Sequence, residues 1–141
     1  MANDTGDFAR SMKIATSGLR AQAGRMRVIS ENIANADSTA QTAGGEPYRR
    51  KIPTFTSALD RSLDAKVVTL GRIRSDQTTF RIKNEPGNPA ADAQGNVKYP
   101  NVNPLVEMTD MREAQRSYEA NLNIISATRR MIQRTLDILK A

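Results

Sequence analysis

The sequence of 141 residues contains neither cysteine nor histidine. A chain without these residues can form no disulfide, no Ser-His-Asp triad, no thiol nucleophile and no zinc or haem site held by histidine or cysteine. Tryptophan is also missing, and aromatic residues make up only 4% of the chain. With 38% hydrophobic residues, the composition is too apolar for a disordered chain but lean for a tightly packed globular protein.

Long apolar segments are missing as well. No apolar run approaches the roughly 18 residues that a transmembrane helix requires. The stretch Met1–Asp7 is polar and acidic, whereas a secretory signal begins with a basic region followed by an apolar stretch. We therefore expect a chain that does not span a membrane and that, if it leaves the cytoplasm, does so without a cleaved signal peptide.

The net charge of +6 requires that nucleic acid be considered as a partner. The excess is spread thinly, with +2 over residues 1–36, +3 over 37–103 and +1 over 104–141. The densest cluster is Arg49-Arg50-Lys51, next to Tyr48, and solvated surface charge is its simpler interpretation. A basic helical adaptor that binds nucleic acid or an anionic membrane surface remains the alternative function.

No residue pattern of an active site stands out. Asp60 and Asp64 are four residues apart but lie beside Arg61 and Lys66, which is typical of a solvated face rather than of a buried acid–base pair. Gly44-Gly45 is followed by no Gly-Lys-Ser/Thr and so forms no phosphate loop. The sequence predicts no enzyme, no catalytic or metal-binding residue, no cofactor and no small-molecule substrate.

Both ends of the chain carry a helical pattern. From Phe8 to Ala36, apolar residues recur in alternating steps of four and three, interrupted only by Gln22. This heptad-like spacing predicts a long helix from about residue 7 to residue 35, capped by Asp4 or Thr5. Gly18 and Gly24 lie inside it, each at a cost of about 1 kcal/mol relative to alanine. They indicate either close approach by another helix or simple drift.

The carboxyl end repeats this alternation from Met108 to Leu139. Asn103-Pro104 reads as a helix cap followed by proline at the first helical position. A second apolar stripe, Ile124, Met131 and Ile138, widens the face late in the helix. One partner helix cannot cover both stripes, so we expect apolar surface to remain exposed, and such surface normally marks an interaction site.

Residues 37–102 contain five of the six prolines. Four short runs favour strands, namely Ile52–Phe55, Val67–Leu70, Arg72–Arg74 and Phe80–Lys83. In the last run, Phe80 and Ile82 alternate with charged residues, which predicts a strand that buries this apolar pair. Residues 90–96 are expected to form an irregular loop.

The expected fold class is therefore α+β and mainly α. Two long antiparallel terminal helices form a coiled-coil-like hairpin with a small inserted β-rich module. We divide the chain into an amino-terminal helix over residues 1–36, the module with its loops over 37–102, and a carboxyl-terminal helix over 103–141.

Several motifs, in order along the chain, match one known family. The most distinctive is Asn32-Ile33-Ala34-Asn35. The others are Ser17–Gln22, Arg25–Ala36, Gly45–Lys51, Ala91–Gly95, Tyr99–Asn103, Glu107–Met111 and Tyr118–Asn121. Through them the chain resembles the axial rod and hook proteins of the bacterial flagellum, and most closely the proximal rod subunits of the C type. It departs from that family's pattern at Asn88, Ala90 and Asn96, where histidine, an acid and an aromatic residue are expected.

The resemblance implies a structural subunit of the basal-body rod in the periplasm, stacked helically into a torque-transmitting shaft that lines a channel. Its implied partners are other copies of itself, neighbouring axial proteins and, during secretion, the flagellar type III export apparatus. Nucleic acid is not among them.

The residues expected at assembly contacts combine apolar helix positions with the polar residues of the two helical motifs. They are Leu19, Met26, Ile29, Asn32, Ile33, Asn35, Tyr118, Glu119, Asn121, Leu122, Ile125, Ile132 and Leu136. Packing between the two helices of one chain is an equally good interpretation of the apolar positions. Asn32 and Asn35 also fit a helix C-terminal cap, and Glu119 and Asn121 also fit ordinary surface residues.

Overall fold

The computed structural model describes residues 2–140. The chain divides into two compact units. The first unit contains Met1–Met26, Thr54–Arg72 and Glu113–Ala141, and the second contains Arg27–Pro53 and Ile73–Arg112. Each unit therefore combines part of each terminal helix with part of the middle of the chain.

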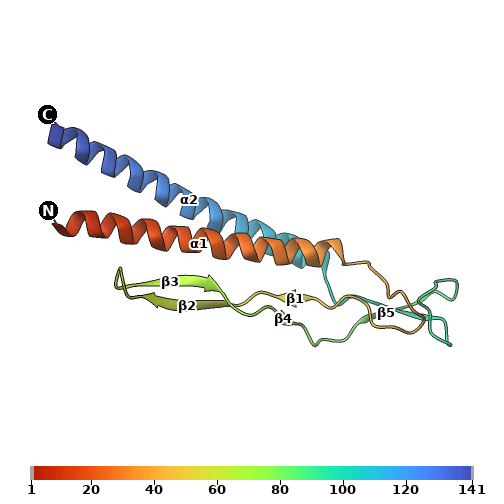
Figure 1. The fold of residues 1–141 in the computed structure, drawn as a ribbon. Coiled ribbons are helices and arrows are strands. Elements are labelled where there is room, and N and C mark those ends of the chain that lie inside the picture. Colours follow the sequence, from red (N-terminus) through yellow and green to blue (C-terminus); the bar gives the residue numbers. More distant parts are fainter. Residues whose placement is uncertain (1, 141) are drawn as a thin grey trace. The chain divides into compact units, whose positions relative to one another are not determined.

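The two helices are α1, Ala2–Ala34, and α2, Pro104–Lys140 (Figure 1). Helix α2 begins at the expected residue, and its cap is confirmed, because the Asn103 Oδ1 accepts the Leu105 N–H at 3.1 Å. Helix α1 begins about five residues earlier than expected, so Asp4 and Thr5 lie inside the helix and not at its cap. Neither helix, among the residues described, is long and apolar enough to span a membrane.

In the described residues, six strands follow α1 and precede α2 in the sequence, and they form three antiparallel two-stranded ribbons (Figure 1). The pairs are β1 (Lys51–Ile52) with β4 (Arg74–Ser75), β2 (Phe55–Asp60) with β3 (Ala65–Leu70), and β5 (Arg81–Asn84) with β6 (Asn96–Tyr99). The expected fold class, two long helices with a small strand module between them, is confirmed. Asp60 is the last residue of β2, and Asp64 lies in the turn before β3.

The expectation that Ile82 is buried is wrong, because all four residues of strand β5 are exposed. Ile82 is 66% exposed and lies opposite Lys98. The other face of the ribbon pairs Lys83 with Val97 and Arg81 with Tyr99, and Val97 and Tyr99 form the core of the second unit with Ala90. The alternation that places apolar residues in the core is that of β6, where Val97 and Tyr99 are buried. Its first residue, Asn96, was expected to lie in a loop. The phase of β5 follows from its pairing with β6.

In the first unit, α1 and α2 run antiparallel. A Cβ on Gly18 would come within 2.8 Å of the Asn121 side chain, and Arg25 forms a 3.4 Å ion pair with Glu113. Close approach of a helix at Gly18 is therefore confirmed. At Gly24 the expectation was wrong about the neighbour, because a Cβ there would come within 2.7 Å of Leu70, which belongs to strand β3.

Several buried positions of each helix lie one residue beside the expected stripe, although Ala15 and Ile29 of α1 lie on it and are buried. Leu19 and Met26 are only half-buried, whereas Gly18 and Ala21 are buried. The buried positions of α1 are Ala15, Gly18, Ala21, Val28, Ile29 and Asn32, and those of α2 are Glu107, Ala114 and Thr128. Most of these residues are small or polar. Small residues permit close backbone approach, which a stripe of large apolar side chains does not.

Candidate assembly interface

Exposed apolar side chains concentrate on α2. Among the described residues, nine of the fourteen exposed large hydrophobic side chains belong to this helix. They are Leu105, Val106, Met108, Leu122, Ile124, Met131, Leu136, Ile138 and Leu139. Single exposed apolar residues are ordinary, but a concentration on one element indicates a surface that another molecule covers.

Three of these side chains form one line along α2 in the first unit, which we name the outer stripe: Ile124, Met131 and Ile138. They are 47%, 47% and 76% exposed. A spacing of seven residues keeps them on one side of a helix with 3.6 residues per turn. The half-buried line through Ile125 and Ile132 is about a quarter turn away by the same geometry. The second stripe expected from the sequence is therefore exposed.

An apolar groove lies between the two helices of the first unit. It encloses about 270 Å³ and is lined by Phe8, Ala9, Met12, Ile132, Thr135, Leu136 and Leu139. It brings two of the expected interface residues, Ile132 and Leu136, to the start of α1. On the α1 side, the large apolar side chains of the groove are Phe8, at the beginning of the predicted helical stripe, and Met12.

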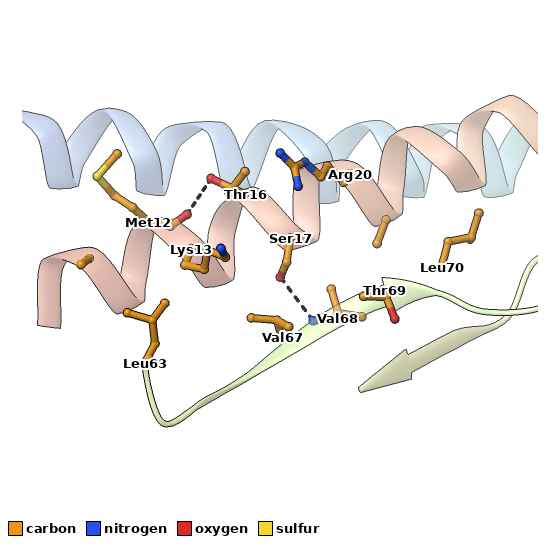
Figure 2. A pocket seen from close by; sticks show the side chains of 12 residues that line it. Met12, Lys13, Thr16, Ser17, Arg20, Leu63, Val67, Val68, Thr69 and Leu70 are labelled. Atoms are coloured by element: carbon orange, nitrogen blue, oxygen red, sulfur yellow. Dashed lines mark hydrogen bonds between the residues drawn. The ribbon is translucent and has the colours of Figure 1, made fainter. Parts of the chain in front are cut away.

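A second and larger groove of about 560 Å³ separates α1 from β3 in the first unit. Figure 2 shows Met12, Lys13, Thr16 and Arg20 of α1 on one side of it, and β3 on the other. The Ser17 hydroxyl reaches across and accepts the backbone N–H of Val68 at 3.2 Å. This bond fixes one edge of the β2–β3 ribbon to the helix.

The second unit is organised around the side chain of Asn32, which is completely buried. Its Nδ2 donates to the Glu107 carboxylate at 3.0 Å and to the Lys51 carbonyl at 2.8 Å. Its Oδ1 accepts the Lys51 N–H at 2.9 Å and the Tyr48 hydroxyl at 2.8 Å. All four hydrogen-bonding positions of the amide are thus used. We name Asn32 and the residues bound to it the polar hub.

The buried carboxylate of Glu107 is balanced by Arg50. The Arg50 Nε donates to it at 2.6 Å, and the same guanidinium lies 3.5 Å from Asp76 and 3.8 Å from Asp110. Burial disfavours the charged guanidinium, but the hydrogen bond and charge of Glu107, with those of Asp76, outweigh this and raise the pKa of Arg50. Glu107 of the polar hub is therefore joined to Arg50 by a hydrogen-bonded ion pair.

Tyr48 is the neutral donor of the hub. Burial, followed by the negative charges of Glu31 and Glu107, raises the pKa of Tyr48 to about 12. Its phenol therefore stays protonated at neutral pH and keeps donating to Asn32. No local pattern in the sequence indicates this contact for Tyr48 or Glu107, although both lie in motifs that carry the family resemblance.

The basic cluster Arg49-Arg50-Lys51 is not a solvated surface patch. Arg49 packs over the Phe80 ring at 4.2 Å and donates to the carbonyl of Asp76. Lys51 forms an ion pair with Glu31. The simpler interpretation from the sequence, solvated surface charge, was therefore wrong, because these three cations form contacts within the second unit. Nothing here supports the nucleic-acid alternative.

The other expected interface residues are distributed over both kinds of environment. Ile29 is buried, whereas Glu119, Leu122 and Leu136 are exposed. The half-buried ones are Leu19, Met26, Ile33, Asn35, Tyr118, Asn121, Ile125 and Ile132. The Asn35 Nδ2 donates to the Glu31 carbonyl at 2.8 Å, but Asn35 does not have the positive φ of a left-handed helix cap. For Asn32 the cap interpretation was wrong, because its bonds lead away from α1.

The three positions that depart from the family pattern lie at or near the β5–β6 turn. The Asn88 side chain accepts the Ala90 N–H at 3.0 Å and donates to Glu85 at 3.1 Å. The Asn96 Oδ1 accepts from Asn84 at 3.1 Å, and Ala90 is buried in the core of the second unit. The two asparagines that depart from the family pattern therefore form hydrogen bonds within this turn region.

Comparison with known proteins gives consistent matches over both helices. Residues 12–40 match the family model for flagella basal body rod proteins, and residues 93–138 match the model for the C-terminal region of flagellar basal body rod FlgEFG proteins. The first match covers Asn32 and most of α1, and the second covers β6 and nearly all of α2.

The chain is also similar over nearly its whole length to flagellar basal-body rod proteins FlgC. It is 54% identical to that of Agrobacterium fabrum, with 95% of this chain and 96% of the relative covered. It is 38% identical to that of Bacillus subtilis over 92% of this chain and 97% of the relative, and 35% identical to that of Aquifex aeolicus over 95% and 98%.

These matches define the class of protein first: a structural subunit of the rod in the flagellar basal body, a class in which the homologues are rod proteins and not enzymes. Within that class, the chain belongs to the FlgC family of proximal rod proteins. It assembles in the basal body with other rod proteins.

Proposed function

We propose that this chain builds the proximal rod by stacking helically with copies of itself and with other axial proteins. In this arrangement the rod transmits torque and encloses a channel. The observation that carries the proposal is the outer stripe, which places three large apolar side chains in water on a helix that already has a partner. Its contact with a different surface of the next subunit is heterologous, and heterologous contacts that do not close generate helical filaments.

The assembly contacts proposed are the outer stripe together with the thirteen residues expected from the sequence, and the thirteen act in two ways. Exposed members, such as Leu122 and Leu136, touch neighbouring subunits directly. Buried members, such as Ile29 and Asn32, set the positions of the helices that present them. In this proposal, residues 1–36 and 103–141 form the axial part of the subunit, and residues 37–102 form the module attached to it.

We further propose that the subunit reaches its place in the periplasm through the flagellar type III export apparatus, without cleavage of its amino terminus. The resemblance of the helical motifs to axial proteins supports this. Phe8 and Met12, which line the apolar groove with α2, would then be retained in the assembled rod.

The test is Met131→Asp, in the middle of the outer stripe. Because Met131 is exposed in the unassembled chain, its free energy of unfolding is expected to change by no more than about 0.5 kcal/mol. In the rod, the new charge would be buried without a partner at a cost of several kcal/mol, so rod assembly and motility should be lost.

The matched control is Asn123→Asp, which introduces the same charge at an exposed polar position of α2. Cellular protein level, incorporation into purified basal bodies and swimming are measured for both variants. A Met131→Asp strain that assembles rods and swims as well as the Asn123→Asp strain would contradict the proposed interface.

A further inference from the structure

The β2–β3 ribbon has two edges, and among the described residues only the β3 edge is covered, by helix α1. The Val68 N–H points to the Ser17 hydroxyl of α1 (Figure 2), so this residue of β3 faces away from β2. In an antiparallel ribbon, successive residues alternate between facing the partner strand and facing outward. Val67 and Thr69 therefore face β2, where they pair with Ala58 and Thr56.

The same alternation defines the other edge. Since Thr56, Ala58 and Asp60 face β3, the backbone N–H and C=O groups of Phe55, Ser57 and Leu59 point outward. The Gly71 N–H donates to the Thr54 carbonyl at 2.6 Å. Thr54 therefore faces the β3 side, like Thr56 and Ala58, which fits the same alternation. Strand β2 thus presents three residues with outward backbone groups. Phe55 and Leu59 are 41% and 57% exposed.

This edge lacks the usual features that prevent strand pairing. Proteins protect exposed edges with charged residues, proline, bulges or a covering element. Residues 55–59 contain neither a charge nor a proline, and all six residues of β2 pair in register with β3, without a bulge. The other two ribbons carry charged residues in their strands, for example Lys51 and Arg81. The β2 edge is therefore available to a further strand.

We propose that the β2 edge pairs with the same edge of a second copy of this chain, antiparallel and centred on Ser57. The sequence is self-complementary in that register. Phe55 lies opposite Leu59 of the second copy, Thr56 opposite Ala58, and Asp60 opposite Thr54. Apolar residues face apolar residues, and no like charges are opposed. The result is a four-stranded sheet, β3-β2-β2-β3, with main-chain hydrogen bonds across the new junction.

This pairing differs from the rod contact in its symmetry. It is isologous, so it closes as a two-fold dimer, whereas a filament requires heterologous contacts. The dimer therefore belongs to the chain outside the rod. It occupies the β2 edge and leaves the outer stripe of α2 uninvolved, so the two proposals can fail independently.

The absence of cysteine allows a direct test. In Ser57→Cys the introduced thiol is the only one in the chain, and the two copies would place it opposite itself. Directly opposed residues of a hydrogen-bonded antiparallel pair have Cα atoms about 5.5 Å apart, within the range that a disulfide spans. We expect oxidation to yield a covalent dimer at least ten times faster than with the matched control, Thr69→Cys. Thr69 is also exposed, but it lies on strand β3, whose outer edge faces helix α1.

The register is tested with a mixture of Phe55→Cys and Leu59→Cys chains, one of them carrying a mass tag. Antiparallel pairing predicts mixed dimers that link position 55 to position 59. Dimers that link each position to itself would overturn the proposed register.

The uncrosslinked chain provides the final test. By analytical ultracentrifugation, the unmodified chain is expected to show a concentration-dependent dimer that is lost in Ser57→Lys and retained in Met131→Asp. Circular dichroism checks that both variants are folded. The proposal is overturned if the unmodified chain stays monomeric and Ser57→Cys crosslinks no faster than Thr69→Cys. It is equally overturned if Ser57→Cys crosslinks in cells only to a different rod protein.

Discussion

The amide of Asn32 joins three segments of the second unit that are distant in sequence: helix α1, strand β1 and the beginning of α2. It bonds the backbone of Lys51 on both sides and the carboxylate of Glu107. Asparagine fits this place because it offers two donors and an acceptor oxygen in one short side chain. No other side chain of similar size matches that pattern without adding a charge.

Asn32→Asp is therefore expected to destabilise the chain strongly despite the near-identical shape. The substitution removes both donors and places a second carboxylate beside Glu107 in a buried site. Breaking a buried polar arrangement in this way typically costs about 3–5 kcal/mol. Urea unfolding followed by circular dichroism measures the loss.

The matched control is Asn35→Asp, which changes the same chemical group one turn later. There the amide donates only to a carbonyl near the end of α1, and an acid at this position opposes the helix dipole by about 0.3–1 kcal/mol. Equal losses of stability in the two variants would show that the polar hub does not depend on the Asn32 donors.

At the scale of the elements, the position of α1 against α2 in the first unit depends on the missing side chain of Gly18. A Cβ there would come within 2.8 Å of three atoms of the Asn121 side chain. Asn121 is held in turn by a 2.9 Å bond to the Ser117 carbonyl. Glycine at position 18 lowers the helix propensity of α1 but permits the close packing against Asn121.

Gly18→Ala is expected to lower the free energy of unfolding by up to about 2 kcal/mol. Alanine gains up to about 1 kcal/mol in helix propensity, but overpacking at this contact typically costs 1–3 kcal/mol. Thermal and urea unfolding measure the balance.

The double variant Gly18→Ala/Asn121→Ala separates the two contributions. Removing the Asn121 amide makes room for the new methyl group, so the double variant should be more stable than the sum of the single changes predicts. Additive effects within about 0.3 kcal/mol would mean that the two residues are not in contact.

At the scale of the whole molecule, the response to acid should depend on the second unit. Hydrogen bonding from the backbone N–H of Thr78, followed by the charge of Arg50, lowers the pKa of Asp76. Asp76 is therefore linked through Arg50 to the buried carboxylate of Glu107. Because the folded chain binds this proton less tightly than the unfolded chain, the contribution of Asp76 is complete above the unfolded pKa of about 3.9. It is lost as the pH falls from there through the lowered folded value.

Asp76→Asn should therefore be less stable than the unmodified chain at pH 6, by about 1–2 kcal/mol, and the difference should shrink as the pH falls below about 4. Urea unfolding at pH 6, 4 and 3 measures it. Asp64→Asn is the control, because Asp64 is exposed and asparagine tolerates its positive φ of 46° equally well. A difference at Asp76 that stays constant with pH would contradict the assignment.

Features that depend on neighbours along the chain could be predicted from the sequence. The two long helices, the Asn103 cap, the strand tendency of four short runs and the close approach at Gly18 all follow from local patterns or single-residue properties. Membership of the rod family follows from motifs in sequence order. The exposed outer stripe was also predictable, since a helix with two apolar stripes and one partner leaves one stripe uncovered.

The tertiary structure alone decided which partner each side chain met. Periodicity identified apolar residues of the helices, and Ala15 and Ile29 on the expected stripe are buried. Gly18 and Ala21 are buried in place of Leu19 because small residues permit closer packing. Ile82 is exposed opposite Lys98, and the ribbon contributes Val97 and Tyr99 of β6 to the core instead. From the sequence, Arg50 was interpreted as surface charge and Asn32 as a helix cap. Both bind Glu107, which lies 57 residues after Arg50 and 75 residues after Asn32. Propensity acts within a few residues, whereas burial and ion pairing depend on contacts that only folding brings together.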